Sequence, residues 1–172
     1  RVGLARAVMT TVHAYTAGQH IVDGASADFR RGRAGAANIV PTSTGAALAT
    51  TQALPDLRGR FDGTAIRVPV PVGSIADITG VTDRPTSAAE INQILREEAA
   101  SDRYRRVVGV SDDPMVSTDI IGDPRACVVD AAMTQVVDHT LAKVMAWYDN
   151  EWGFTHQMVR EGLALLGIEA EV

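Results

Sequence analysis

The stretch Thr10-Thr11-Val12-His13-Ala14-Tyr15-Thr16 closes an apolar run that begins at Leu4. Leu, Ala, Val and Met without helix punctuation predict a strand over residues 4–12, which would release His13 into a loop. The unperturbed pKa of histidine suits it to proton transfer near neutral pH. A single histidine beside apolar residues is more often a hydrogen-bonded structural group, so both interpretations stay open at this point.

Composition indicates one water-soluble globular domain with a sizeable core. The chain has 172 residues, of which 46% are hydrophobic and 22% charged, and its mean hydropathy is +0.03. These values argue against both disorder and a membrane location. The net charge of −5 gives no general attraction to nucleic acid. Residues 1–6 lack the apolar core of a signal peptide, so we expect a cytoplasmic protein.

Two further features of the chain bear on its chemistry. The single Cys127 excludes an intrachain disulfide and a cysteine-based zinc site, and its strand-like surroundings predict a small core residue rather than a nucleophile. No Gly-x-Gly-x-x-Gly fingerprint of a dinucleotide site is present. The sequence opens inside an apolar element without an initiating Met, so we expect it to be part of a longer chain.

The first half of the chain combines a long loop, a short helix and two strands. Residues 16–41 form a polar, glycine-containing segment whose basic cluster at residues 30–33 is a solvated surface, a subunit contact or an anion site. A helix is expected over residues 46–54, where Thr44 and Gly45 either cap the helix or hold a phosphate. Arg67 lies in a Val, Ile and Pro-rich strand region over residues 61–81, as a surface side chain or an anion ligand.

The second half predicts two helices and four strands. Ser87 and Glu90 have the spacing of a capping box, which favours a helix over residues 87–100. A last helix ends at Leu166 before Gly167 and carries one apolar stripe. Strands are expected at residues 104–110, 115–121, 127–130 and 141–147, with a turn at 138–140.

Five segments together resemble one family in its order: phosphorylating glyceraldehyde-3-phosphate dehydrogenase. They are Thr10 to Thr16 with Gln19, Asp28-Phe29-Arg30-Arg31-Gly32-Arg33, Asn38-Ile39-Val40-Pro41-Thr42-Ser43-Thr44-Gly45-Ala46-Ala47, Arg67-Val68-Pro69 and Trp147-Tyr148-Asp149-Asn150-Glu151-Trp152-Gly153. The resemblance implies an α+β fold. This fold has a large, mostly antiparallel mixed sheet, helices mainly on one face, and a C-terminal helix that packs on a nucleotide-binding domain absent here.

The resemblance also implies a domain plan. Residues 1–149 would be the catalytic domain, including an S-shaped loop at 16–41, and residues 150–172 would return to the absent NAD(P)-binding domain. The family's nucleophilic cysteine and dinucleotide site would precede residue 1, so this piece is expected to be inactive alone. The S-shaped loop would lie at the centre of a homotetramer. No metal, membrane or nucleic-acid partner is expected.

Residue roles follow by the same resemblance. In the family a thiolate attacks the aldehyde, hydride passes to the nicotinamide, and inorganic phosphate cleaves the thioester. His13 matches the proton-accepting histidine. Thr16 and Arg67 match the ligands of the substrate phosphate, Thr44 and Gly45 match the inorganic-phosphate site, and Asn150 matches the residue that binds the nicotinamide carboxamide.

Two departures and two alternatives accompany this assignment. Phe154 stands where the family usually has Tyr, which puts one contact near the nicotinamide in doubt, and the small pair Gly24-Ala25 leads to the hypothesis that NADP is accepted as well as NAD. The near alternative is a related enzyme acting on another phosphorylated aldehyde, such as erythrose 4-phosphate. The other is a non-catalytic binding or assembly module that keeps the interface loop.

Overall fold

The computed structural model describes residues 1–168, so the last four residues of the expected C-terminal segment lie outside the described part. Seven strands form one sheet in the order β2-β3-β1-β4-β7-β6-β5. They are β1 (Arg6–Ala14), β2 (Val40–Ser43), β3 (Phe61–Val68), β4 (Ser74–Val81), β5 (Val108–Ser111), β6 (Cys127–Val137) and β7 (Leu141–Tyr148). The helices are α1 (Ala46–Ala53), α2 (Ala88–Ala99) and α3 (Trp152–Leu165), with short 3-10 turns η1 (Gly35–Ala37) and η2 (Pro55–Leu57).

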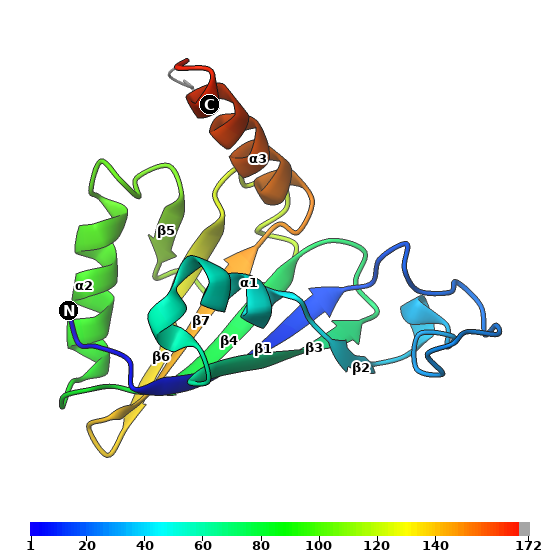
Figure 1. Cartoon of the computed structure of the whole chain (residues 1–172), viewed down its shortest axis with the longest axis horizontal. Helices are drawn as coiled ribbons and strands as arrows, with labels where there is room; N and C mark the ends of the chain where they lie inside the picture. The colour runs from blue at the N-terminus through cyan, green and yellow to red at the C-terminus, as the bar shows by residue number, and fades with distance from the viewer. Residues whose placement is uncertain (169–172) are drawn as a thin grey trace.

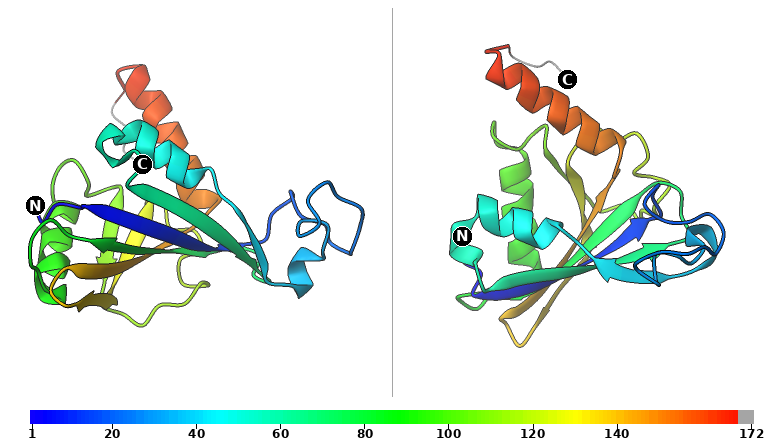
Figure 2. Two further views of the ribbon diagram at one scale, coloured as in Figure 1. Left: turned by 60° about the horizontal axis from the view of Figure 1, so that its bottom comes forward. Right: turned by 45° about the vertical axis from the view of Figure 1, so that its right-hand side comes forward.

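The sheet is mixed and mostly antiparallel, which confirms the predicted α+β class. Only β1 with β3 and β5 with β6 pair in parallel among the described strands. Helix α1 packs against β3, and α2 packs against β5 and β6. Both views in Figure 2 show α1 and α3 rising on the same side of the sheet.

The central strand β1 sorts its residues by face. Ala7, Met9 and Thr11 are buried on the helix side, whereas Val8 on the opposite side is 61% exposed. Successive side chains of a strand point to opposite faces, so this alternation leaves the second face of the sheet without a helical cover. His13 lies two residues after Thr11 on the same strand, so its side chain points to the same face of the sheet, the one that the helices cover.

Several local expectations are wrong for identifiable reasons. His13 does not enter a loop, because β1 continues to Ala14. The strand expected at residues 115–121 is irregular, since Asp119 Oδ2 accepts from the Val116 N–H at 2.7 Å and folds that segment into a turn. Of the strand expected at residues 104–110, only the last three residues are extended, and they belong to β5 (Val108–Ser111).

A strand that sequence patterns did not predict begins at the end of the long loop. β2 (Val40–Ser43) pairs with β3 as an edge strand of the sheet, and its first two residues fall within the loop expected at 16–41. An edge strand tolerates Pro41, which lacks a backbone donor. β3 itself is an inner strand that ends at Val68, so Pro69 and Pro71 follow the ladder and do not interrupt it.

Other expectations are confirmed. Ser87 Oγ accepts from the Glu90 N–H at 3.2 Å, which is one half of the predicted capping box; the Glu90 carboxylate binds Arg84 and Thr86. The 138–140 turn connects β6 to β7, with positive φ angles of 45° and 56° at Asp138 and His139. Gly167 follows α3 with a φ of 70°, as expected of a residue that ends a helix.

Helix α3 turns its polar face inwards. Gly153 is buried and His156, Gln157 and Arg160 are partly covered, whereas Met158 is 57% exposed. Figure 1 shows α3 projecting from the sheet at one end of the molecule. Its apolar stripe consequently lacks a partner among the described residues, and such a stripe is stable in water only when it is covered.

The start of α3 is held by one carboxylate. Asp149, 3% exposed, accepts from the backbone N–H groups of Glu151 and Trp152 with Oδ1, at 2.9 and 2.7 Å, and from Gly122 N–H with Oδ2 at 2.9 Å. Burial raises the pKa of this carboxyl, but the three N–H donors outweigh burial and lower it overall. Asp149 thus ties the helix to the turn before β6.

We predict that Asp149→Ala destabilises the chain by about 2 kcal/mol at pH 7, because three buried donors lose a charged acceptor. A carboxyl with a lowered folded-state pKa contributes stability above its unfolded pKa and loses it as pH falls through the folded value. The gap between wild type and variant, measured by urea unfolding, should therefore narrow as pH is lowered from about 5 towards 2. Asp149→Asn is the matched control, and a gap independent of pH would contradict the assignment.

Candidate active site

The parallel pairing of β1 with β3 places His13 directly opposite Arg67. One guanidinium nitrogen, Arg67 Nη1, donates to the Ala14 carbonyl at 3.0 Å and also contacts His13 Nδ1. The His13 ring packs edge-on against Tyr148, with ring centroids 5.9 Å apart. Sheet register therefore fixes an imidazole and a cation side by side at the ends of two neighbouring strands.

Two groups contact Nδ1 of His13. Nδ1 lies 2.7 Å from the Ala14 carbonyl oxygen, which can only accept, and it also contacts Arg67 Nη1, which can only donate, so these two contacts do not select one tautomer. Nε2, the other ring nitrogen, takes part in neither contact and is the atom available for proton transfer. Burial lowers the pKa of His13, the Ala14 hydrogen bond opposes this, and the nearby Arg67 charge lowers it further. The net effect favours a neutral imidazole, which is the form required of a base.

A cavity of about 380 Å³ opens on the helix side of the sheet at this point. Its volume lies within the range typical of small-molecule sites. It brings together His13, Arg67, Thr44 and Asn150, four of the six residues singled out from sequence. Phe154 and Gln157 of α3 close another side, with Phe154 67% exposed.

Asn150 has a fixed orientation in this cavity. Its Oδ1 accepts from the Gly73 N–H and from Ser74 Oγ, both at 3.1 Å. Ser74, 2% exposed, in turn accepts from the Ala14 N–H at 3.2 Å. The oxygen is thus engaged on the protein side, and the Nδ2 group is what Asn150 offers to a ligand carbonyl.

Thr16 lies in a smaller hollow on the other side of Arg67. This hollow, about 30 Å³, is also lined by Arg31 and Thr42. Arg31 donates from Nε and Nη2 to Thr42 Oγ1, each at 3.1 Å. Burial lowers the pKa of Arg67, and Arg31 lowers it further, as expected of two neighbouring cations. A hydroxyl and two guanidinium groups form a site suited to an anion.

Thr44 and Gly45 precede helix α1, as expected. Thr44 Oγ1 accepts from the Ala46 N–H at 3.1 Å, so the capping role is present, and Thr44 also lines the cavity. A Cβ added to Gly45 would meet no atom within 4 Å, so the backbone there is open to a ligand. The structure does not place Gly45 among the residues lining the cavity.

Cys127 lies apart from this chemistry. It begins β6, is half-buried, and burial raises the pKa of its thiol despite the nearby Arg125. A raised thiol pKa disfavours the nucleophilic thiolate, and the described lining of the cavity does not include Cys127. Within residues 1–168 no cluster of three His, Cys, Asp or Glu could hold a metal, and no helix is long and apolar enough to span a membrane.

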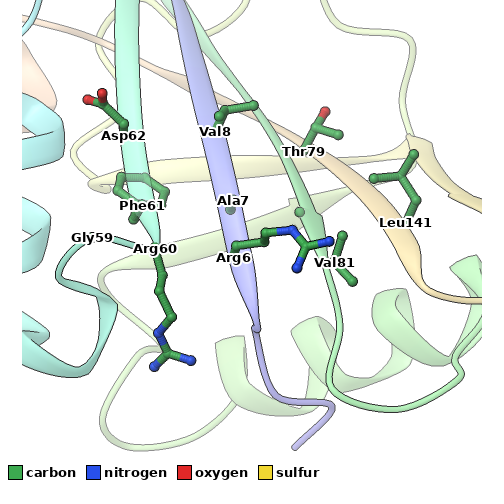
Figure 3. A pocket seen from close by; sticks show the side chains of 11 residues that line it. Arg6, Ala7, Val8, Gly59, Arg60, Phe61, Asp62, Thr79, Val81 and Leu141 are labelled. Carbon is green, nitrogen blue, oxygen red and sulfur yellow. The ribbon is translucent and has the colours of Figure 1, made fainter.

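A second cavity, about 510 Å³, opens on the face of the sheet that carries no helix. Figure 3 shows Val8, Thr79 and Leu141 on neighbouring strands, with the Arg6 guanidinium extending towards Val81. This hollow is larger than the one at His13, but no imidazole or thiol lines it. Volume alone therefore does not identify the catalytic side of the sheet.

Sequence reasoning missed Ser74 and Tyr148 as members of the site. Tyr148 has a pKa raised by burial, and hydrogen bonds to Ser74 and Thr11 oppose that rise. The Ser74 hydroxyl joins the His13 strand to Asn150, although 76 positions separate Ser74 from Asn150. No local pattern could have indicated that contact.

The fold and site together define an α+β domain that places a half-buried histidine beside Arg67 and, across a smaller hollow, Arg31. The chain matches the family model for the glyceraldehyde 3-phosphate dehydrogenase C-terminal domain over residues 1–150. It belongs to that family, as the sequence resemblance predicted.

Curated relatives named glyceraldehyde-3-phosphate dehydrogenase agree with this assignment. The Mycobacterium avium protein is 46% identical over 165 residues, covering 96% of this chain and 48% of the relative. The Zymomonas mobilis protein is 46% identical over 159 residues, covering 92% and 47%. A protein of Streptomyces arenae, named glyceraldehyde-3-phosphate dehydrogenase 2, is 49% identical over 158 residues, covering 92% and 47%. The chain thus spans about half the length of the curated relatives it matches.

We predict that Ser74→Ala uncouples Asn150 from the His13 strand, since Ala14 N–H loses its acceptor and Asn150 Oδ1 loses a donor. The cost of the buried groups left unpaired is about 1–3 kcal/mol. Amide hydrogen exchange at Ala14 should accelerate. Ser101→Ala is the matched control, because the Ser101 hydroxyl donates to Glu98 O at the end of α2. Unchanged Ala14 protection in Ser74→Ala would show that the bond contributes nothing.

Proposed function

We propose that this chain is the catalytic-domain portion of an NAD(P)-dependent phosphorylating glyceraldehyde-3-phosphate dehydrogenase. The observation that carries the proposal is the cavity in which His13, Arg67, Thr44 and Asn150 meet. The thiol nucleophile and the main dinucleotide site would come from the other half of a protein as long as the relatives. The 172-residue piece alone would therefore be inactive.

Within the cavity, His13 would act as the base. Its Nε2 would take the proton of the thiol and return it to the adduct oxygen when the thiolate adds to the aldehyde. The neutral imidazole would then take the proton of that hydroxyl as hydride leaves the same carbon. Burial and the Arg67 charge both lower the pKa of His13, which favours the neutral imidazole and supports that role. Removing the hydroxyl proton makes loss of hydride from the same carbon favourable.

The anion sites would bind the two phosphates of the reaction. Arg67 and Thr16 would hold the terminal phosphate of the aldehyde, with Arg31 adding charge to the same hollow. Thr44 and Gly45 would hold the inorganic phosphate at the start of α1, where free N–H groups and the helix dipole favour an anion. Arg67 lines both spaces and would keep the two phosphates at a set separation.

Asn150 fits the cofactor role assigned by resemblance. With Oδ1 engaged by Gly73 and Ser74, the Nδ2 group would donate to the carboxamide oxygen of a nicotinamide. NAD(P) supplies the hydride acceptor when bound, and the residues of this chain would orient its ring. Phe154, exposed at the cavity, would provide apolar contact without the hydroxyl of a Tyr.

Self-association and a cytoplasmic location complete the proposal. The S-shaped loop exposes Ile21, Val22 and Phe29 at 85%, 73% and 89%. Large apolar side chains so fully exposed indicate a surface that becomes buried on assembly. We therefore propose a homotetramer in which this loop lies at a subunit interface.

The direct test is NAD(P) reduction by the full-length protein with glyceraldehyde 3-phosphate and inorganic phosphate. We expect His13→Asn to lower kcat by about 10²–10⁴-fold, since general base catalysis contributes that much. His139→Asn is the matched control, because Asn tolerates the left-handed conformation at His139, where φ is 56°. No phosphate-dependent reduction by the intact enzyme would refute the proposal and favour a non-catalytic assembly module. Faster turnover of erythrose 4-phosphate would assign the related dehydrogenase instead.

The cofactor preference forms a separate prediction. A Cβ at Gly24 would lie 2.8 Å from His20 Nδ1, so the His20 imidazole packs directly against Gly24 and occupies the place that a larger residue there would need. An imidazole can donate to a phosphate, and the ribose 2′-phosphate of NADP would fit this chemistry. We expect measurable turnover with both NAD and NADP. Turnover with NAD and none with NADP would remove this proposal.

A further inference from the structure

A second charged hollow lies between α3 and the body of the domain. It consists of two cavities, about 470 and 480 Å³, which share Arg105, Arg106 and Arg160. Arg125 and His156 also line it. These five residues, called the arginine groove below, come from three separate segments: the chain after α2, the turn before β6, and α3 itself.

Arginines outnumber the acids among the described residues that line the groove. Four arginines face two acids, Asp102 and Asp123, and one of the four, Arg106, is already engaged in an interaction. Asp123 is committed to Arg125 at 2.5 Å, whereas Asp102, with its side chain 96% exposed, reaches Arg105 only at 3.6 Å. An exposed pair at that separation contributes little.

Arg160 has no acid of its own in the described contacts. Its Nη1 lies 3.4 Å from the neutral Gln157 Oε1. The whole chain carries a net charge of −5, so this positive excess is a local feature and not a consequence of composition.

The groove has a fixed frame. Gly153 packs so closely that an added Cβ would lie 2.6 Å from the Arg125 carbonyl oxygen, which brings α3 against the turn. Gln157 Nε2 donates to the Pro124 carbonyl at 2.9 Å and more weakly to the Arg106 carbonyl at 3.4 Å. These contacts join α3 to the turn before β6 and to the chain after α2, which are the three segments that line the groove.

The arginine groove adjoins the catalytic cavity at one residue. Gln157 lines both the groove and the catalytic cavity and so marks their boundary. Arg160 belongs to the inward face of α3, opposite the apolar stripe that includes Met158. A domain that covers the apolar stripe would therefore leave the groove accessible.

We propose that the arginine groove binds a small multivalent anion of the phosphate type, such as an oligophosphate, at a site separate from the catalytic cavity. Guanidinium groups match phosphate oxygens in pairs, and groups from three directions suit a ligand with several charged centres. The volumes correspond to a small molecule rather than to a polymer. This inference does not depend on the proposed catalytic function.

Inorganic tripolyphosphate is the probe, and binding to the full-length protein is measured by calorimetry. Every protein compared in this experiment carries Arg67→Gln as a common background, because this substitution weakens anion binding at the catalytic cavity. In that background we expect Arg105→Gln with Arg160→Gln to weaken tripolyphosphate binding by at least about tenfold, since charged hydrogen bonds are lost. Arg103→Gln is the matched control, an exposed arginine on the same segment that stacks on Tyr104 and should leave binding unchanged.

Each contrary outcome has a distinct meaning. Equal binding by the double variant and its parent would overturn the proposal. Equal weakening by Arg103→Gln would indicate diffuse surface attraction and would also overturn it. Absence of binding in the parent, together with lower stability in the double variant, would show that an acidic segment of the longer chain fills the groove. None of these outcomes bears on aldehyde oxidation, which is measured separately.

Discussion

The parallel pairing of β1 with β3 is the constraint on which the site depends. It sets His13 opposite Arg67, and the reach of Arg67 Nη1 to the Ala14 carbonyl holds the two strand ends together. A slip of β1 by one residue would turn His13 to the other face of the sheet, away from Arg67. The contact between His13 and Arg67, and the part of the lowered His13 pKa that the Arg67 charge causes, both follow from this one register.

A chain of buried polar groups extends that register to the rest of the cavity. The Ala14 N–H donates a hydrogen bond to Ser74 Oγ, which in turn donates to Asn150 Oδ1. Asp149, the neighbour of Asn150, accepts from the first backbone N–H groups of α3 and so holds the start of that helix. Buried polar groups must be paired, so each link restricts the next. Helix α3 meets this domain with polar contacts and keeps its apolar stripe for another surface. That arrangement suits a domain built to work against a second one.

Local patterns predicted elements better than they predicted the site. The capping signal at Ser87 and the turn before β7 depend on neighbours in sequence, and the structure confirms both. β2 and the short extent of β5 were missed, because pairing partners decide them. His13, Thr44, Arg67 and Asn150 were identified by family resemblance, since their meeting in one cavity depends on contacts across more than fifty residues. Ser74 and Tyr148 required the coordinates.

The paired arrangement of His13 and Arg67 is tested most directly by the pKa of His13, followed by NMR in the full-length protein and in its Arg67→Met variant. We expect a wild-type pKa below the ordinary 6.5, because burial and the neighbouring cation disfavour the imidazolium. Removing the guanidinium charge should raise it. A wild-type value at or above 6.5 that does not change in the variant would contradict the paired arrangement of His13 and Arg67.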